Sequence, residues 1–177
     1  FTNALIERKG APTGLLTTAG FRDTLEMRRE HKYELYDIFI ELPQPIVRRS
    51  LRLEVPERIG PDGRVVLALD ETALIERTRE LVALGVQSVA IVFLHSYANG
   101  AHELRARDLI AREFPGLFVS LSSDVSPQIR EYERTSTTVV NAYILPIVKR
   151  YLQTLRASLD SAGIAAPMLL MQSNGGL

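Results

Sequence analysis

The apolar run Val86–Leu94 constrains the fold of this chain more than any other segment, because it has the length of a strand and no alternation of polar and apolar residues. Strands of this kind are buried on both faces, as in parallel sheets. A helical pattern precedes the run, with Asp70 in the N-cap position and Gly85 as its stop. A helical pattern over His102–Phe114 and a strand pattern over Leu117–Leu121 follow it. This order predicts parallel strands joined by right-handed crossovers.

Shorter elements of both kinds precede this core. The residue patterns predict a helix over residues 2–9, a strand over residues 13–18 and a helix over residues 20–30. Residues 33–45 carry aromatic and aliphatic side chains without a clear period, together with two prolines, Pro43 and Pro45. Such a stretch is typical of an extended connection.

An antiparallel hairpin is predicted next. Two runs of alternating polarity, Leu51–Val55 and Arg64–Leu69, flank the sequence Gly60-Pro61-Asp62-Gly63. An Asp-Gly pair between such runs marks a β-hairpin, because the turn needs residues that tolerate positive φ.

From Ser126 onward the pattern is helical for a long distance. Ser126 and Pro127 are residue types that open a helix as N-cap and first helical residue. Apolar residues then recur at spacings of three and four as far as Leu159, so one stripe of the segment is expected to be buried. Pro146 lacks a backbone N–H and is expected to break or kink the helix. Gly163 is expected to end it.

These elements predict an α/β protein with a mixed, largely parallel sheet, a β-hairpin and a long C-terminal helical segment. We expect an α/β domain over residues 1–125, and a helical segment and strand over residues 126–177 that begin a second domain. The chain starts within a helical pattern and without methionine. It ends a few residues after an apolar run, Met168–Met171, is followed by polar residues and glycines. We therefore expect it to be a piece of a larger protein.

Composition excludes several functional classes. Lys+Arg and Asp+Glu both number 21, so no net charge attracts nucleic acid or an anionic membrane. No cysteine is present, which removes disulfides, thiolate zinc sites and a cysteine nucleophile. The longest apolar runs fall far short of the roughly 20 residues that span a bilayer. We expect a cytoplasmic protein without a nucleic-acid or membrane partner.

Polar side chains follow the buried strand, at the position where open α/β sheets bind ligands. His95 stands there, with His102 and Glu103 nearby in the sequence. His95 is therefore a candidate acid–base residue, and these side chains could also bind a metal ion. Alternatively, His95 and Ser96 hydrogen-bond to the strand end, and Asn99 caps the next helix. Because two histidines without a third ligand are weak evidence, no metal site is predicted.

The segment Ser122–Pro127 follows the next strand and allows two interpretations. Its hydroxyls and the N-terminal amides of the following helix could hold an oxyanion or a phosphate. Serine, aspartate and proline also build ordinary strand-to-helix turns, which is the more common arrangement.

Arg134 precedes four hydroxyl residues, Thr135-Ser136-Thr137-Thr138, within the long helical pattern. Hydroxyl residues form helices poorly, so something other than local preference supports them. In one interpretation the run faces a cleft between domains, which makes Arg134, Thr137 and His95 the candidate catalytic residues. In the other, Glu131 and Arg134 pair at the surface.

Near the end of the chain, an apolar run breaks into Ser173-Asn174-Gly175-Gly176. Glycine lets a backbone approach a ligand closely, so Ser173, Asn174, Gly175 and Gly176 are candidate cofactor-binding residues. A double glycine is also common in ordinary turns.

Several segments together resemble the hydantoinase/oxoprolinase family, which includes N-methylhydantoinase A subunits, 5-oxoprolinases and acetone carboxylase subunits. The resemblance covers essentially the whole chain. The segments that carry it are residues 2–10, Thr17-Thr18-Ala19-Gly20-Phe21-Arg22-Asp23, residues 35–37, 94–103, 122–125 and 130–143, and Gln172-Ser173-Asn174-Gly175-Gly176-Leu177.

The resemblance implies a part of an actin/Hsp70-like ATPase fold and a parent enzyme that uses ATP and Mg²⁺. Such an enzyme is an ATP-dependent amidohydrolase that opens a small cyclic amide, of the hydantoin or 5-oxoproline type, by phosphorylating the carbonyl-derived oxygen. The family's phosphate loops, Asp-x-Gly-Gly-Thr, do not occur in this sequence. We therefore expect the fragment alone to be inactive and to bind no cofactor.

The resemblance leaves two alternatives open. The parent could be a subunit of an acetone-carboxylase-type ligase, or this region could serve mainly as a docking surface for another subunit. In either case, a partner subunit of the hydantoinase B type is expected.

Overall fold

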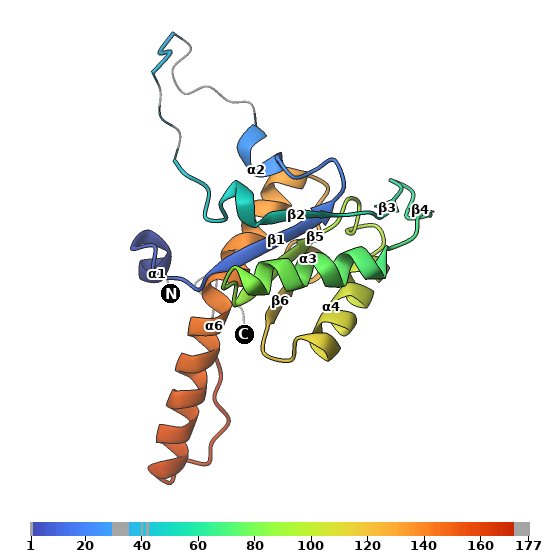
Figure 1. Ribbon diagram of the computed structural model, residues 1–177. Coiled ribbons are helices and arrows are strands. Elements are labelled where there is room, and N and C mark those ends of the chain that lie inside the picture. Colours follow the sequence, from blue (N-terminus) through green and yellow to red (C-terminus); the bar gives the residue numbers. More distant parts are fainter. Residues whose placement is uncertain (1, 30–35, 40, 42, 172–177) are drawn as a thin grey trace. The chain divides into compact units, whose positions relative to one another are not determined.

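The computed structural model describes residues 2–29, 36–39, 41 and 43–171 of the 177-residue chain (Figure 1). It divides into two compact units, residues 1–146 and residues 147–177. Within the described ranges, no helix combines the length and apolar character needed to cross a membrane.

A four-stranded parallel sheet forms the centre of the first unit (Figure 1). Its strands lie in the order β2 (Arg52–Val55), β1 (Thr13–Thr18), β5 (Ser88–Val92) and β6 (Phe118–Leu121). Every pair of neighbours is parallel. All five residues of β5 are buried, as the missing alternation predicts. The predicted α/β class with a mainly parallel sheet is confirmed.

Helices cover both faces of this sheet. On one face, α3 (Glu71–Ala83) and α4 (Ala101–Glu113) pack on alternate residues of the strands, including Leu16 and Ile91. On the other face, α2 (Thr24–Met27) and the first part of α6 (Glu131–Ser161) pack on the strand residues that point the opposite way, including Leu15 and Ala90. Successive side chains of a strand point to opposite faces, so each strand contributes to both layers.

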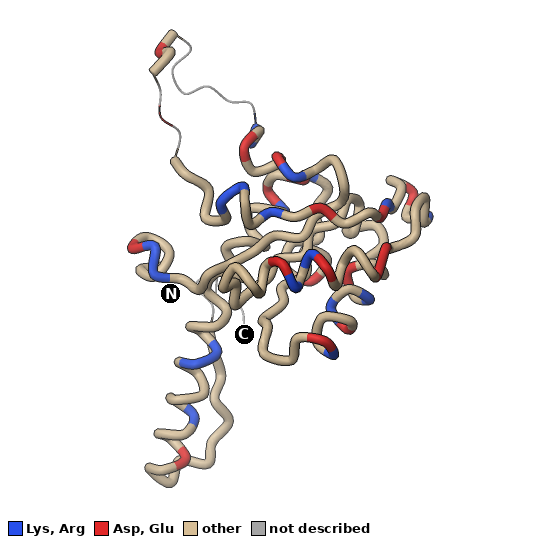
Figure 2. Tube along the Cα trace, viewed as in Figure 1, with Lys and Arg blue, Asp and Glu red and all other residues tan. Residues whose placement is uncertain are grey.

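The helix α3 has the ends predicted for it. The Asp70 carboxylate accepts a hydrogen bond from the backbone N–H of Ala73 at 2.9 Å. Gly85 follows the helix with φ of 83°, a conformation that favours glycine. Oppositely charged residues alternate along α3 and α4 (Figure 2), and Arg105 of α4 pairs with Glu71 of α3 at 2.7 Å.

The predicted hairpin exists, but one of its strands was assigned wrongly. The hairpin consists of β3 (Arg58–Ile59) and β4 (Val65–Leu67), which are antiparallel. The run 51–55 instead completes the 3-10 helix η1 (Arg49–Leu51) and forms β2, which pairs with β1. Alternating polarity does not distinguish a hairpin strand from an edge strand of a larger sheet, and burial against the sheet determines the pairing.

The start of the long helix was also predicted wrongly. Ser122–Val125 forms the one-turn helix α5, and Ser126 ends it instead of opening α6. Ser126 is extended, at φ −154° and ψ 72°, because the residue before a proline avoids the helical region. The helix α6 begins at Glu131 and continues through Pro146, so of the two predicted outcomes, a break or a kink, the break is wrong. A proline removes only one hydrogen bond of the ladder, and here its ring is buried.

The second unit contains the end of α6 and the segment that follows it. Gly163 has φ of 75° and its N–H donates to the Asp160 carbonyl, which confirms that glycine as the end of the helix. In the last turns of α6, Arg156 pairs with Asp160 at 3.0 Å.

The first helices of the chain are shorter than predicted. Helix α1 covers only Thr2–Ile6, and α2 only Thr24–Met27. Arg8 and Arg28, just beyond them, have φ of 56° and 55°, which ends each helix early. Gly10 follows the predicted helix 2–9 and lies where a Cβ would be 2.1 Å from Cε1 of Tyr143. Because glycine has no side chain, the Tyr143 ring can lie this close to the backbone.

Gly10→Ala is therefore expected to destabilise the protein by about 1–3 kcal/mol, since the added methyl overpacks the contact with the Tyr143 ring. Urea unfolding measures the change. Gly116→Ala is the matched control, because a Cβ there meets nothing within 4 Å. A Gly10→Ala variant as stable as the control would contradict the close packing.

Candidate active site

Buried polar side chains gather at the carboxyl edge of the parallel sheet. Thr18 ends β1, Ser96 follows β5, and Ser122 follows β6. Each of these hydroxyl residues is buried, and so are Glu103 of α4 and Arg134 of α6. Because parallel strands present their carboxyl ends at one edge, residues far apart in the sequence meet there.

A directional chain of hydrogen bonds connects Arg134 to Glu103. The Arg134 Nη1 donates to Ser96 Oγ at 2.7 Å, and Ser96 Oγ lies 2.9 Å from Ser122 Oγ. Ser122 Oγ in turn donates to Glu103 Oε1 at 2.6 Å. Since each hydroxyl has one proton, Ser96 must donate to Ser122. The two serines thus link a buried cation to a buried carboxylate.

Glu103 is fully buried, with a residue exposure of 0%. Its Oε1 also accepts from the backbone N–H of Phe93 at 2.8 Å, and its Oε2 from the N–H of Ser123 at 2.8 Å. The carboxylate therefore connects the ends of β5 and β6 to α4. It also occupies the Ser123 amide, which therefore has its hydrogen-bond acceptor within the protein.

This role of Glu103 was not predicted from the sequence, where Glu103 is notable only as a neighbour of His102. A signal for it was present: Glu103 lies on the buried face of α4, together with Ala106 and Ile110. A carboxylate on the apolar face of an amphipathic helix indicates a buried polar partner, because an unpaired buried charge is costly.

Arg134 is 1% exposed, so the alternative interpretation, a surface pair with Glu131, is wrong. Its guanidinium carbon lies 5.6 Å from the centre of the Tyr97 ring. Burial lowers the pKa of the Arg134 guanidinium from its usual value, while the Glu103 carboxylate acts in the opposite direction. The Arg134 Nε is buried and has no hydrogen-bond partner among the residues that the structure describes.

The hydroxyl run of α6 is stabilised by its own helix. Thr135 Oγ1 donates to the Glu131 carbonyl at 2.6 Å, and Thr138 Oγ1 donates to the Arg134 carbonyl at 2.7 Å. Both threonines are buried, whereas Thr137 is exposed. The run thus fits the helix because two of its hydroxyls bond to the preceding turn.

The candidates His95, His102 and Glu103 bond to separate partners. His95, at φ 56°, has its Nδ1 2.8 Å from the Ile59 carbonyl, so Nδ1 carries a proton and donates it to that oxygen. His102 Nδ1 lies 2.7 Å from the buried Glu57 carboxylate, which also accepts from Thr18. Within the described part of the chain, no cluster of three such side chains could hold a metal ion.

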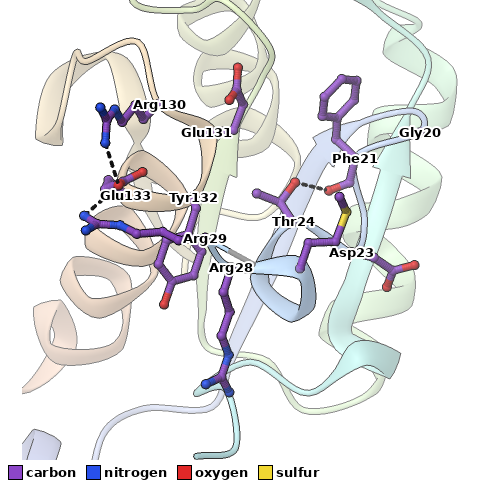
Figure 3. A pocket seen from close by; sticks show the side chains of 11 residues that line it. Gly20, Phe21, Asp23, Thr24, Arg28, Arg29, Arg130, Glu131, Tyr132 and Glu133 are labelled. Atoms are coloured by element: carbon purple, nitrogen blue, oxygen red, sulfur yellow. Dashed lines mark hydrogen bonds and ion pairs between the residues drawn. The ribbon is translucent and has the colours of Figure 1, made fainter. Parts of the chain in front are cut away.

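A pocket of about 420 Å³ opens beside this edge, between the turn after β1 and the start of α6 (Figure 3). Two of its basic residues are engaged by one acid, because Glu133 Oε1 lies 2.6 Å from Arg29 and 3.8 Å from Arg130. The pocket is lined by Gly20, Phe21, Asp23, Thr24, Met27, Arg28, Arg29, Arg130, Glu131, Tyr132 and Glu133. The candidate cofactor residues Ser173, Asn174, Gly175 and Gly176 lie outside the described residues.

Comparison with known proteins places these residues in a family context. Residues 1–114 match the model of the hydantoinase/oxoprolinase N-terminal region, and residues 134–177 match the hydantoinase/oxoprolinase model. The chain is 42% identical to caprolactamase subunit alpha of Pseudomonas jessenii over 99% of its own length and 25% of that subunit. It is 32% identical to 5-oxoprolinase 1 of Arabidopsis thaliana over 99% of its length and 15% of that protein.

Solved structures agree with the sequence relatives. The crystal structure of the ATP-dependent caprolactamase from Pseudomonas jessenii matches with a TM-score of 0.88 and 41% identity, over 97% of this chain and 25% of that one. The nucleotide-free acetone carboxylase structure matches with a TM-score of 0.79 and 29% identity, over 91% and 24% of the two chains. The chain thus spans about a quarter of the caprolactamase subunit, and it belongs to the hydantoinase/oxoprolinase family.

Proposed function

We propose that this chain is part of an ATP-dependent enzyme that opens a cyclic amide, such as a hydantoin or a lactam of the 5-oxoproline type, through phosphorylation of the carbonyl oxygen. The observation that carries the proposal is the 42% identity to a caprolactamase subunit over 99% of the chain. Caprolactam and 5-oxoproline are both cyclic amides. An unstrained amide resists attack by water, and phosphorylation of its oxygen makes the carbon electrophilic.

Apart from the candidate residues Ser173, Asn174, Gly175 and Gly176, the sequence offers no motif for binding a nucleotide. The sequence contains no Asp-x-Gly-Gly-Thr phosphate loop, and the described residues include no cluster that could hold a metal ion. ATP and Mg²⁺ would accordingly be held by other residues of the parent enzyme. The contribution proposed for this chain is the wall of the substrate cleft, with Arg134, His95 and Thr137 as the candidate catalytic residues.

A polypeptide of these 177 residues is expected not to bind Mg-ATP measurably, because backbone amides of phosphate loops and ligands of Mg²⁺ supply most of the affinity for a triphosphate. Titration calorimetry checks this, with circular dichroism to establish that the polypeptide is folded. Saturable micromolar binding to the folded polypeptide would overturn the expectation.

Activity of the full-length parent tests the proposed function itself. The purified enzyme would be incubated with ATP, Mg²⁺ and, in turn, caprolactam, 5-oxoproline and hydantoin. We expect a ring-opened product from at least one of them, formed together with ADP. Product without ATP, or no product from any cyclic amide, would contradict the proposal.

An acetone-carboxylase-type ligase is the second candidate, and the TM-score of 0.79 to the acetone carboxylase structure supports it. ATP-dependent incorporation of bicarbonate into a ketone, without ring opening of any amide, would identify that reaction. Because the caprolactamase and acetone carboxylase relatives are named as subunits, we also propose a partner subunit, of the hydantoinase B type. Co-expression with neighbouring open reading frames and co-purification would test for it.

A further inference from the structure

A small cavity is lined by Arg134 and shares Phe21, Thr24 and Glu131 with the larger pocket. Its volume is about 10 Å³, which is the space that one water molecule needs. Its lining includes groups from the carboxyl ends of β1 and β5 and from the first turns of α6. The lining residues are Thr17, Phe21, Thr24, Val92, Leu94, Glu131, Arg134 and Thr135.

The cavity offers both a hydrogen-bond donor and an acceptor for water. The donor is Arg134 Nε, which is buried and bonds to no described residue. Arg134 cannot turn away to satisfy this nitrogen, because its Nη1 is held by Ser96 at 2.7 Å. A buried donor without a partner is costly, and water in a polar cavity is a usual remedy.

The acceptor is Glu131, which lines both this cavity and the larger pocket. Figure 3 shows its side chain beside Phe21 without a hydrogen bond or ion pair to any residue drawn, whereas Glu133 in the same turn is joined to Arg29 and Arg130. Glu131 therefore remains available to accept a proton at the boundary between the cavity and the pocket.

We propose that Arg134 and Glu131 hold the water molecule that opens the ring, with Glu131 as its general base. This inference rests on the proposed function and deepens it, because a bound nucleophilic water belongs to a hydrolase and not to a ligase. Thr17 also lines the cavity, since it shares with Leu15 the side of β1 that packs on α6. Its hydroxyl is the third polar group of the proposed site.

The chemistry balances with one ATP, one cyclic amide and two waters. Phosphorylation of the amide oxygen, as in the proposed function, releases ADP and the proton of the ring nitrogen. Arg134 Nε–H donates to the oxygen of the bound water, and one water O–H donates to the Glu131 carboxylate. As that oxygen bonds to the activated carbon, the proton passes to Glu131. The carbon–nitrogen bond then breaks, and the ring nitrogen takes up both protons of this water, one of them from the Glu131 carboxyl. The product is an open chain with one amine and one acyl phosphate. A second water hydrolyses the acyl phosphate to a carboxylate and inorganic phosphate, and Glu131 has returned to its initial state.

Glu131→Gln in the full-length enzyme tests the role of the base. General-base catalysis contributes about 10²- to 10⁴-fold, so we expect kcat for ring opening to fall at least 100-fold with KM changed less than threefold. Added formate should restore part of the rate to Glu131→Ala, which a merely structural role would not produce. Glu76→Gln, an exposed glutamate on α3, is the matched control. A Glu131→Gln enzyme within threefold of the wild-type kcat would overturn the proposal.

Two further measurements keep the proposal testable if Glu131 variants fail to fold. Thr17→Val keeps the shape of the side chain and should lower kcat at least tenfold while leaving the melting temperature unchanged. A high-resolution crystal structure of the wild-type parent should show ordered water within hydrogen-bond distance of Arg134 Nε. A protein atom bonded to that nitrogen would refute the water site. If the wild-type enzyme opens no cyclic amide, the proposed function fails, while the crystal structure still tests the water site independently.

Discussion

Glu103→Ala is expected to lower the free energy of unfolding by about 3–5 kcal/mol, the cost of removing one partner from a buried charged network. The Glu103 carboxylate accepts from Ser122 Oγ and from the backbone N–H groups of Phe93 and Ser123. Alanine would leave these buried donors without an acceptor and Arg134 without its nearest compensating carboxylate. Urea unfolding monitored by far-ultraviolet circular dichroism measures the loss.

Two variants calibrate that result. Glu103→Gln keeps the shape and one acceptor oxygen, so its loss should be smaller, about 1–3 kcal/mol. Glu113→Ala removes an exposed carboxylate from the same helix, where it pairs only with Arg112 at 3.1 Å, and should change stability by less than about 0.5 kcal/mol. If Glu103→Ala were no more destabilising than Glu113→Ala, the buried network would not hold the sheet edge together.

Arg134→Lys should lower turnover of the full-length enzyme at least tenfold, equivalent to about 1.4 kcal/mol in the activation free energy. Lysine keeps the positive charge, but its single ammonium group cannot both donate to Ser96 and replace the Nε–H that faces the small cavity. Arg134→Ala is less informative, since it also leaves a void in the core and a buried carboxylate without its cation.

The measurement is kcat per folded molecule, with thermal unfolding as the control for stability. Arg77→Lys, on the exposed surface of α3, should leave both quantities unchanged. Loss of stability with normal turnover in the folded fraction would assign Arg134 to the scaffold alone.

Several helices and strands of the first unit could be predicted from residue patterns. The buried strand β5, the helices α3 and α4, and the positions of Asp70 and Gly85 depend on short-range periodicity and capping, which a sequence displays directly. The parallel order also followed, because strand and helix segments of these lengths permit few connections.

Only part of the candidate site could be predicted from the sequence. The hydroxyl run after Arg134 broke the local rules of helix formation and so indicated that contacts beyond the helix support this part of α6. The residues to which Arg134 is connected, Ser96, Ser122 and Glu103, were present in the predicted segments but could not be linked to it. Their hydrogen bonds cross between segments, and nothing in the spacing of residues along the chain encodes them.

By itself, the sequence determined which segments form strands and helices in the central sheet layers, because burial and periodicity act over a few neighbouring residues. Only the tertiary structure decided that residues 52–55 join the main sheet, that Ser126 ends a turn instead of opening α6, and that Arg134 is buried. Each of these outcomes depends on which surface is removed from water and which polar groups then need partners. That balance is settled by contacts between distant segments, and it exists only once the chain is folded.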